Sequence, residues 1–243
     1  VEGYRISGSR VQLRTTATAG PPQRDFLFGV SAYKHLLCDF DGDGVDGIVA
    51  FGDNGNWYIR STATAGPPEQ TVAFGATGYI PVCGDWDGVG GDGIGVYVAG
   101  TWYLRQTPSP GAPHVTFNYG AAGYTPVVGD WDGYVPFVAH GRDGIGVYWG
   151  AGNWNLRQTA SPGAPEISFV YTSYYPPVVG DWDNDILNVD GIGVWGDNGT
   201  WYLRQNAAPG TPEVQYAYGY AGVRPLPGDY DGDGADGSGI VVP

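Results

Sequence analysis

Short runs of alternating apolar and polar residues, separated by turn-forming residues, cover most of the chain. In one stretch they fall at residues 124–130, 143–149, 154–158 and 167–171. Alternation with a period of two is typical of half-buried strands, and four such strands in succession predict an antiparallel meander. No stretch of the sequence keeps a period of 3.6 residues, so we expect almost no helix.

One phrase, an aromatic residue between two aspartates, recurs and divides the chain into similar units. It begins at Asp39, Asp85, Asp130, Asp181 and Asp229, at spacings of 45 to 51 residues. A period of this size indicates stacked or radially arranged units. Units of four short strands are typical of the blades of a β-propeller.

The two ends of the chain predict how the units close. Residues 11–22 match the third strand and following link at 57–68, and residues 239–242 match the second strand at 93–97. Together the two half-units supply one complete blade, which removes free sheet edges. We therefore predict an all-β fold, a single five-bladed β-propeller over residues 1–243 with four antiparallel strands per blade and repeats of about 47 residues. An open solenoid is the alternative.

The composition limits the classes of partner. The chain has 243 residues, 43 Gly, 19 Pro and a formal net charge of −14. This charge argues against nucleic acid and against an anionic membrane surface as partners, and no apolar run approaches the roughly 20 residues of a membrane span. The chain begins without Met and is rich in Gly, Thr, Tyr and Trp. We expect a secreted, extracellular protein whose signal peptide has been removed.

The two cysteines lie at nearly equivalent places in adjacent units. Cys38 and Cys83 each precede an aspartate loop, but they are offset by one residue against the repeat. Side chains on a strand alternate between faces, so the offset weakens the case for a bond. A disulfide between neighbouring inner strands and two buried thiols both remain open.

The repeats resemble a known family. The pattern lies in Gly-Asp-Trp-Asp-Gly at 84–88, Asp-Gly-Ile-Gly-Val-Tyr at 92–97 and Gly-Thr-Trp-Tyr-Leu-Arg at 100–105. These residues, with Phe-Gly at 74–75, resemble FG-GAP/VCBS repeats, and the resemblance recurs over essentially the whole chain. It implies propeller blades like those of integrin-like heads, secreted bacterial proteins and fungal propeller lectins, and hence extracellular recognition without a single ligand. Five blades depart from the about seven of most relatives.

The resemblance also implies calcium in the aspartate loops, bound through loop positions one, three, five and nine. Calcium takes about six to eight oxygen ligands. Loops 39–47 and 229–237 keep the first three carboxylates, but each has Gly at position nine and its nearest carboxylate one place earlier. The eight candidate ligands are Asp39, Asp41, Asp43, Asp46, Asp229, Asp231, Asp233 and Asp236.

Other interpretations of these loops stay open. Their aspartates are also typical of turns in which the side chain accepts local backbone N–H groups. The first aspartate of each loop is also a possible partner of the Arg that ends every third strand. Three clustered carboxylates without a cation repel one another, which keeps the metal interpretation open for the first and fifth loops. The repeated arginines are Arg14, Arg60, Arg105, Arg157 and Arg204.

Aromatic residues recur at fixed places in the repeat. Such repetition is typical of packing between blades, but rings in shallow clefts also stack on sugar faces. Similar clefts around a ring would give a multivalent lectin with high avidity. The candidate ligand-binding residues of this kind are Tyr79, Tyr124, Tyr175, Trp102, Trp154 and Trp201.

The third and fourth loops break the pattern with insertions on one rim of neighbouring blades. They add Tyr134, Phe137, His140 and Arg142 to the candidate ligand-binding residues. Loops that have lost a metal are also free to diverge without acquiring a function.

Three functions follow from these patterns. The first is a secreted, multivalent, lectin-like propeller that binds glycans. The alternative is an extracellular structural or adhesion module that binds a protein or self-assembles through the rim of loops three and four. A glycoside hydrolase needs two carboxylates about 5–9.5 Å apart, but nearly all acidic residues belong to the repeated loops, and no Ser/His/Asp or Cys/His arrangement is visible. We therefore predict no enzyme and no catalytic residues.

Overall fold

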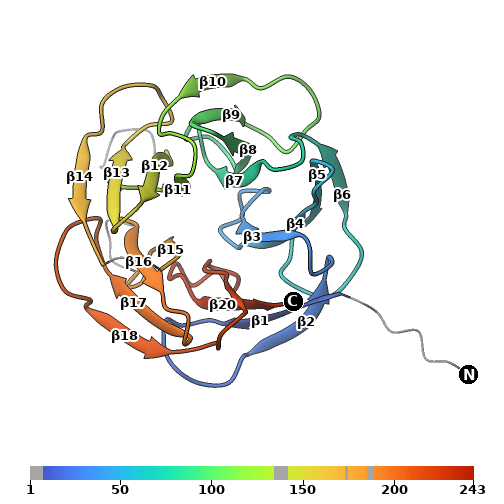
Figure 1. Ribbon diagram of the computed structural model, residues 1–243. Coiled ribbons are helices and arrows are strands. Elements are labelled where there is room, and N and C mark those ends of the chain that lie inside the picture. Colours follow the sequence, from blue (N-terminus) through green and yellow to red (C-terminus); the bar gives the residue numbers. More distant parts are fainter. Residues whose placement is uncertain (1–7, 134–141, 173–174, 185–188) are drawn as a thin grey trace, which may run out of the picture.

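The computed structural model describes residues 8–133, 142–172, 175–184 and 189–243. Figure 1 shows these residues arranged as blades around a common axis. There are five sheets of four antiparallel strands each, and no helix occurs among the described residues. The predicted five-bladed, all-β propeller is confirmed.

Four blades are continuous in sequence, each running from its inner strand near the axis to its outer strand. We number them from the N-terminal side, so that blade 1 contains the first aspartate loop. Blade 1 comprises β3 (Lys34–Cys38), β4 (Gly47–Phe51), β5 (Asn56–Arg60) and β6 (Gln70–Ala73), and blade 2 comprises β7 (Ile80–Gly84), β8 (Gly93–Val98), β9 (Thr101–Arg105) and β10 (Val115–Asn118). Blade 3 comprises β11 (Thr125–Gly129), β12 (Gly144–Trp149), β13 (Asn153–Arg157) and β14 (Ile167–Val170), and blade 4 comprises β15 (Pro177–Gly180), β16 (Gly191–Trp195), β17 (Thr200–Arg204) and β18 (Val214–Ala217).

Blade 5 joins the two ends of the chain. Its inner strands are β19 (Arg224–Pro225) and β20 (Ser238–Val242), and its outer strands are β1 (Ser9–Arg14) and β2 (Arg24–Phe28). β20 pairs with β1 in antiparallel register. The predicted closure by complementary half-blades is therefore confirmed (Figure 1).

The second and third strands of each blade form the core between blades. The second strand of blade 2, for example, is buried from Gly93 to Tyr97, because both faces of its sheet are covered by neighbouring blades. Third strands alternate instead, so that Trp102 and Leu104 are fully buried while Tyr103 between them is partly exposed. This alternation sets which aromatic side chains belong to the core and which reach the rim.

Inner strands line the axis. They line an axial cavity of about 260 Å³, whose wall consists mainly of Pro and Val residues of blades 2 to 4, Pro and Leu residues of blade 5, and His35 and Leu37 of blade 1. A second cavity of about 250 Å³ shares Leu37 and Cys83 with the first and is lined by aspartates. The axis is therefore apolar in one part and acidic in the other.

Candidate functional site

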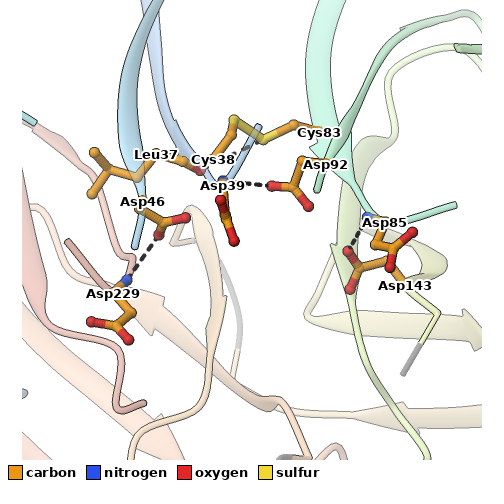
Figure 2. Close-up of a disulfide and its surroundings, with 9 residues drawn as sticks. All are labelled: Leu37, Cys38, Asp39, Asp46, Cys83, Asp85, Asp92, Asp143 and Asp229. Carbon is orange, nitrogen blue, oxygen red and sulfur yellow. Dashed lines mark hydrogen bonds between the residues drawn. A yellow bond between two sulfur atoms is a disulfide. The ribbon is translucent and has the colours of Figure 1, made fainter. Parts of the chain in front are cut away.

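Adjacent blades are joined near the axis by reciprocal hydrogen bonds between two aspartates, an arrangement that we call an aspartate clasp. In the clasp between blades 1 and 2, the backbone N of Asp39 lies 2.9 Å from Oδ2 of Asp92. The backbone N of Asp92 lies 2.6 Å from the carbonyl O of Asp39. Figure 2 shows this contact and two equivalent ones. The five pairs are Asp39–Asp92, Asp85–Asp143, Asp130–Asp190, Asp181–Asp236 and Asp229–Asp46.

The second aspartate of every clasp faces the acidic cavity on the axis. Burial, followed by the charges of nearby aspartates, raises the pKa of Asp143 to about 7 and that of Asp236 to about 8. These carboxylates are therefore partly protonated near neutral pH. The sequence signal for them is an Asp-Gly pair before each second strand, but the pair by itself does not indicate a contact between blades.

Two of the predicted calcium ligands contribute their carboxylates to clasps. Asp46 accepts the N–H of Asp229 through Oδ2, and Asp236 accepts the N–H of Asp181 in the same way. Neither carboxylate belongs to the groups of converging oxygens found in the loops. The structure therefore corrects the proposed role of Asp46 and Asp236: their carboxylates point across a blade junction because their backbone pairs with the neighbouring blade.

The other six predicted ligands do come together, as two groups of three. Carboxylate oxygens of Asp39, Asp41 and Asp43 lie within 4.8 Å of one another. Burial and the charge of Asp43 raise the pKa of Asp41. Each group fits a calcium ion in part, because it offers three of the roughly six to eight oxygens required. The second group is Asp229, Asp231 and Asp233.

Loop two has the geometry of a turn. Asp85 Oδ1 accepts the N–H groups of Gly88 and Val89 at 2.8 Å and 3.3 Å. Val89, where the first loop has Asp43, is 75% exposed. The hydrogen bonds expected of a turn are therefore present, and the third carboxylate is replaced by an apolar side chain.

Within the part of the chain that the structure describes, the repeated arginines bind the links that join the third and fourth strands. Arg14 donates from Nε to the carbonyl of Thr18 at 2.7 Å, in the link that joins the third and fourth strands. Arg60 makes an ion pair of 3.1 Å with Glu69 in the equivalent link of blade 1. Blades 3 and 4 repeat this ion pair with Glu166 and Glu213. Glutamates outside the aspartate loops thus stabilise the links between the third and fourth strands of these blades.

The three tryptophans among the candidate ligand-binding residues are core residues. Trp102, Trp154 and Trp201 are each 0% exposed. The indole N–H of Trp102 donates to the carbonyl of Tyr119 at 2.9 Å. Complete burial is inconsistent with stacking on a ligand, so the structure removes these three residues from the ligand-binding set.

The three candidate tyrosines precede the inner strands and so lie on the rim opposite the aspartate loops, where they are partly exposed. Each of them stacks on a second aromatic ring of its blade. Tyr79 stacks on Tyr103 with ring centroids 6.2 Å apart, and Tyr175 stacks on Tyr202 at the same distance. Blade 3 has Asn155 at the place of Tyr103, and Tyr124 there stacks on Trp149 at 4.6 Å. Blade 1 has an equivalent pair, Tyr33 and Tyr58.

One of these pairs borders a cleft. Between blades 1 and 2, a cavity of about 260 Å³ is lined by Phe74 from the end of blade 1 and by Tyr79, Val96 and Tyr103 from blade 2. Pro113 from the link after β9 completes its wall. Its lining is mostly aromatic and aliphatic, with the polar tips of tyrosines available for hydrogen bonds. Such a shape suits a small ligand with one apolar face.

The predicted rim of loops three and four is described only in part. Tyr134, Phe137 and His140 lie outside the described residues. Arg142 is described and is exposed. Their grouping therefore stays a prediction.

The cysteines form a disulfide between blades 1 and 2. Cys38 is 1% exposed, whereas Cys83 is partly exposed and lines both axial cavities. An oxygen of Asp92 lies within 4.8 Å of both sulfur atoms. The bond thus stands beside the clasp of the same junction (Figure 2).

Comparisons with known proteins give likenesses of shape alone. No protein-family model matches the chain, and no curated protein matches it. Among solved structures, it is similar to BBS1N in complex with ARL6DN: the lead-soaked crystal gives 13% identity over 91% of this chain and 65% of that chain, with a TM-score of 0.49. The mercury-soaked crystal gives 13% identity over 79% and 59%, with a TM-score of 0.47.

A lectin of Agrocybe aegerita, described as recognising non-reducing terminal N-acetylglucosamine, is 15% identical over 94% of this chain and 83% of its own, with a TM-score of 0.41. This chain spans less than two thirds of the BBS1N chains. At such identities and TM-scores, no ligand or partner of these proteins is transferred to this chain. Within the described residues, there is also no helix long and apolar enough to cross a membrane.

Proposed function

We propose that this chain is a carbohydrate-binding propeller and that the cleft between blades 1 and 2 is a ligand site. The observation that carries the proposal is the stacked pair of Tyr79 and Tyr103, which is partly exposed and lines a cleft of about 260 Å³. A tyrosine ring offers an apolar face to the C–H side of a sugar and a hydroxyl to its polar edge. The acidic chain favours uncharged or cationic glycans over sulfated ones.

Four blades carry such a stacked pair, which supports more than one site. Blades 1, 2 and 4 place the second ring on the third strand, and blade 3 places it at the end of the second strand. Several weak sites on one rigid ring raise the avidity for a multivalent glycan surface well above the affinity of any single site.

Binding to a broad glycan array, followed by calorimetry with the best monovalent ligand, tests this proposal. Tyr103→Ala removes one ring face from the cleft and should weaken binding roughly fivefold, because about 1 kcal/mol of apolar contact is lost. Tyr220→Ala is the matched control, since Tyr220 is 52% exposed and belongs to no stacked pair among the described residues. Silence of the wild-type protein across the array, with calcium present, would reject the proposal.

Calcium in the first and fifth loops is part of the same proposal. The two groups of three carboxylates, around Asp41 and Asp231, would hold the ion, which would supply positive charge to balance them. Calcium should raise the melting temperature of the wild-type protein, and the increase should shrink in Asp41→Asn and Asp231→Asn. Asp87→Asn, in the loop with Val89, serves as the control.

We further propose an extracellular location, in which the Cys38–Cys83 disulfide is stable. A protein partner on the rim of loops three and four is the competing function. Deletion of residues 135–142 distinguishes them: loss of partner binding or self-assembly supports the rim of loops three and four, while unchanged glycan binding supports the cleft.

A further inference from the structure

The disulfide and the rim cleft belong to one packed cluster at the junction of blades 1 and 2. Cys38 and Phe74 are among its buried members, and Cys83, Tyr79 and Tyr103 pack against it. Protein interiors are close-packed, so a shift at one end of such a cluster moves its other members. The axis and the cleft of this junction are therefore mechanically connected.

This junction differs from the other four at the residue that precedes the clasp. Where blade 1 has Cys38, blades 2 to 5 have Gly. A Cβ atom at Gly129 would lie 2.6 Å from Oδ2 of Asp190 and 2.8 Å from Cγ1 of Val179 of the next blade. The same holds at Gly84, at 2.7 Å and 2.8 Å from its two neighbours. Close approach of the blades therefore leaves no room for a side chain at this position.

Between blades 1 and 2, this position does carry a side chain, that of Cys38, and it is covalently joined to Cys83 of the neighbouring blade. Cys83 occupies the place that Val128 and Val179 have in the next two blades, and it is bonded to Cys38. Bonded sulfur atoms need far less space than two thiols, which must keep a van der Waals separation of roughly 4 Å. The reduced junction is therefore overpacked, and overpacked cores respond by shifting backbone and side chains.

We propose that the Cys38–Cys83 disulfide is a redox switch for the cleft at the same junction: oxidation closes the blades into the binding geometry, and reduction widens the junction and displaces Tyr79 and Tyr103. The ligand part of this inference rests on the proposed function. The widening does not, because it follows from the packing at the axis.

Reduction proceeds by thiol–disulfide exchange with a dithiol. A thiolate of the reductant attacks Sγ of Cys83, which faces the axial cavities, and the bond to Cys38 breaks. Cys38 leaves as a thiolate and takes up a proton. The second thiol of the reductant then displaces Cys83 as a thiol, and the reductant becomes a cyclic disulfide.

Other contacts hold the junction together after reduction. The clasp of Asp39 and Asp92 does not depend on the disulfide. Nζ of Lys34 on blade 1 also donates to the carbonyl of Tyr79 on blade 2, at 2.6 Å. The response is therefore a local widening with the ring still closed, rather than unfolding.

The first experiment compares the wild-type protein with and without dithiothreitol, with thiol titration to verify two free thiols per chain. Hydrogen exchange is measured on peptides covering residues 74–84 and 93–98 and on equivalent peptides at the junction of blades 3 and 4. We expect exchange to rise at the first junction alone. We also expect the binding that depends on Tyr103 to weaken about tenfold.

Two double variants separate packing from the covalent link. Cys38→Gly with Cys83→Val reproduces the other junctions, and it should bind equally well with and without reductant. Cys38→Ser with Cys83→Ser keeps two unbonded side chains, and it should behave like the reduced protein under both conditions. If this variant does not fold, the wild-type and Gly/Val arms still decide the question.

The outcomes are distinct from those of the proposed function. If no glycan binds under any condition, the proposed function fails, while the exchange data still test the switch. Full reduction without a change in exchange at the junction overturns the inference, and so does a failure of dithiothreitol to reduce the folded protein. Loss of binding in the Gly/Val variant without reductant also contradicts it.

Discussion

The axis and the rim of this propeller carry the same repeat, yet they tolerate variation differently. At the axis, all five junctions have the same aspartate clasp, including the junctions on either side of the blade that joins the two chain ends. At the rim, blade 3 has exchanged Tyr for Trp149 in its stacked pair, and blade 5 has Gln12 and Val223 at the two tyrosine positions.

A physical reason explains the difference. Every junction must close for the ring to close, so the aspartate clasp allows little change in any blade. The two rings of each stacked pair belong to one blade and are partly exposed, so a pair can be replaced without a matching change in the other blades. Differences in binding between blades therefore arise from the stacked pairs at the rim. The aspartate clasps are the same in every blade because they hold the ring together.

The largest expected effect separates two adjacent residues of β9. Trp102→Ala empties a fully buried site and should lower the free energy of unfolding by about 3–5 kcal/mol. Tyr103→Ala, one residue further, should cost less than about 1.5 kcal/mol while weakening ligand binding. Chemical denaturation of both variants, with calorimetry on Tyr103→Ala, checks this contrast, and equal losses of stability would contradict it.

The next effect tests how closely the blades approach at the axis. Gly129→Val places a side chain where Asp190 and Val179 already lie within 2.8 Å of the new Cβ, so we expect a loss of about 2–3 kcal/mol. Gly78→Asn is the control: its φ is +85°, which Asn tolerates, and its Cβ would meet nothing within 4 Å. Similar melting temperatures for the two variants would show that the junction is looser than described.

A smaller effect concerns the pH dependence of the axis. The pKa of Asp143 is raised from 3.8 to about 7 by burial, so the folded protein binds a proton there that the unfolded chain releases. This contribution to stability is full below about pH 4 and is lost as the pH rises through about 7. Partial solvent access limits it to roughly 1 kcal/mol.

We therefore expect the wild-type protein in EDTA to be more stable at pH 5 than at pH 7.5, with a weaker slope in Asp143→Asn. The Asn variant keeps a carbonyl oxygen that can accept the N–H of Asp85. Asp132→Asn removes a charge from the same face without touching a clasp carboxylate. Denaturation curves at a series of pH values give the slopes, and parallel slopes for wild type and Asp143→Asn would refute the assignment.

The smallest effect tests whether the rim pair is exchangeable. Trp149→Val, the residue of blade 2 at this place, should cost about 0.5–1.5 kcal/mol by removing the stack on Tyr124. Adding Asn155→Tyr should restore most of the lost stability, because the new ring then comes from the third strand, as in blades 1, 2 and 4. All nine tryptophans are described and Trp149 alone is not buried, so its fluorescence also reports ligand binding at blade 3.

Much of the fold could be predicted because it depends on local pattern. The alternation of apolar residues predicted the four strands per blade, and the match of residues 11–22 to residues 57–68 predicted the shared blade. The candidate site was predicted less well. Tyr79, Tyr124 and Tyr175 are partly exposed and stay candidates, whereas Trp102, Trp154 and Trp201 are buried. Repetition alone does not say which face of a strand meets the neighbouring blade.

The sequence by itself determined the strands, their number per blade and the closure of the ring, since these follow from periodicity and repeat length. Only the tertiary structure decided what the residues that recur in each repeat do. Asp46 and Asp236 serve blade junctions rather than calcium loops, and the one-residue offset of Cys38 and Cys83 is what brings them together. Both outcomes depend on how one blade is displaced against the next, a relation between segments about 45 residues apart that no local pattern encodes.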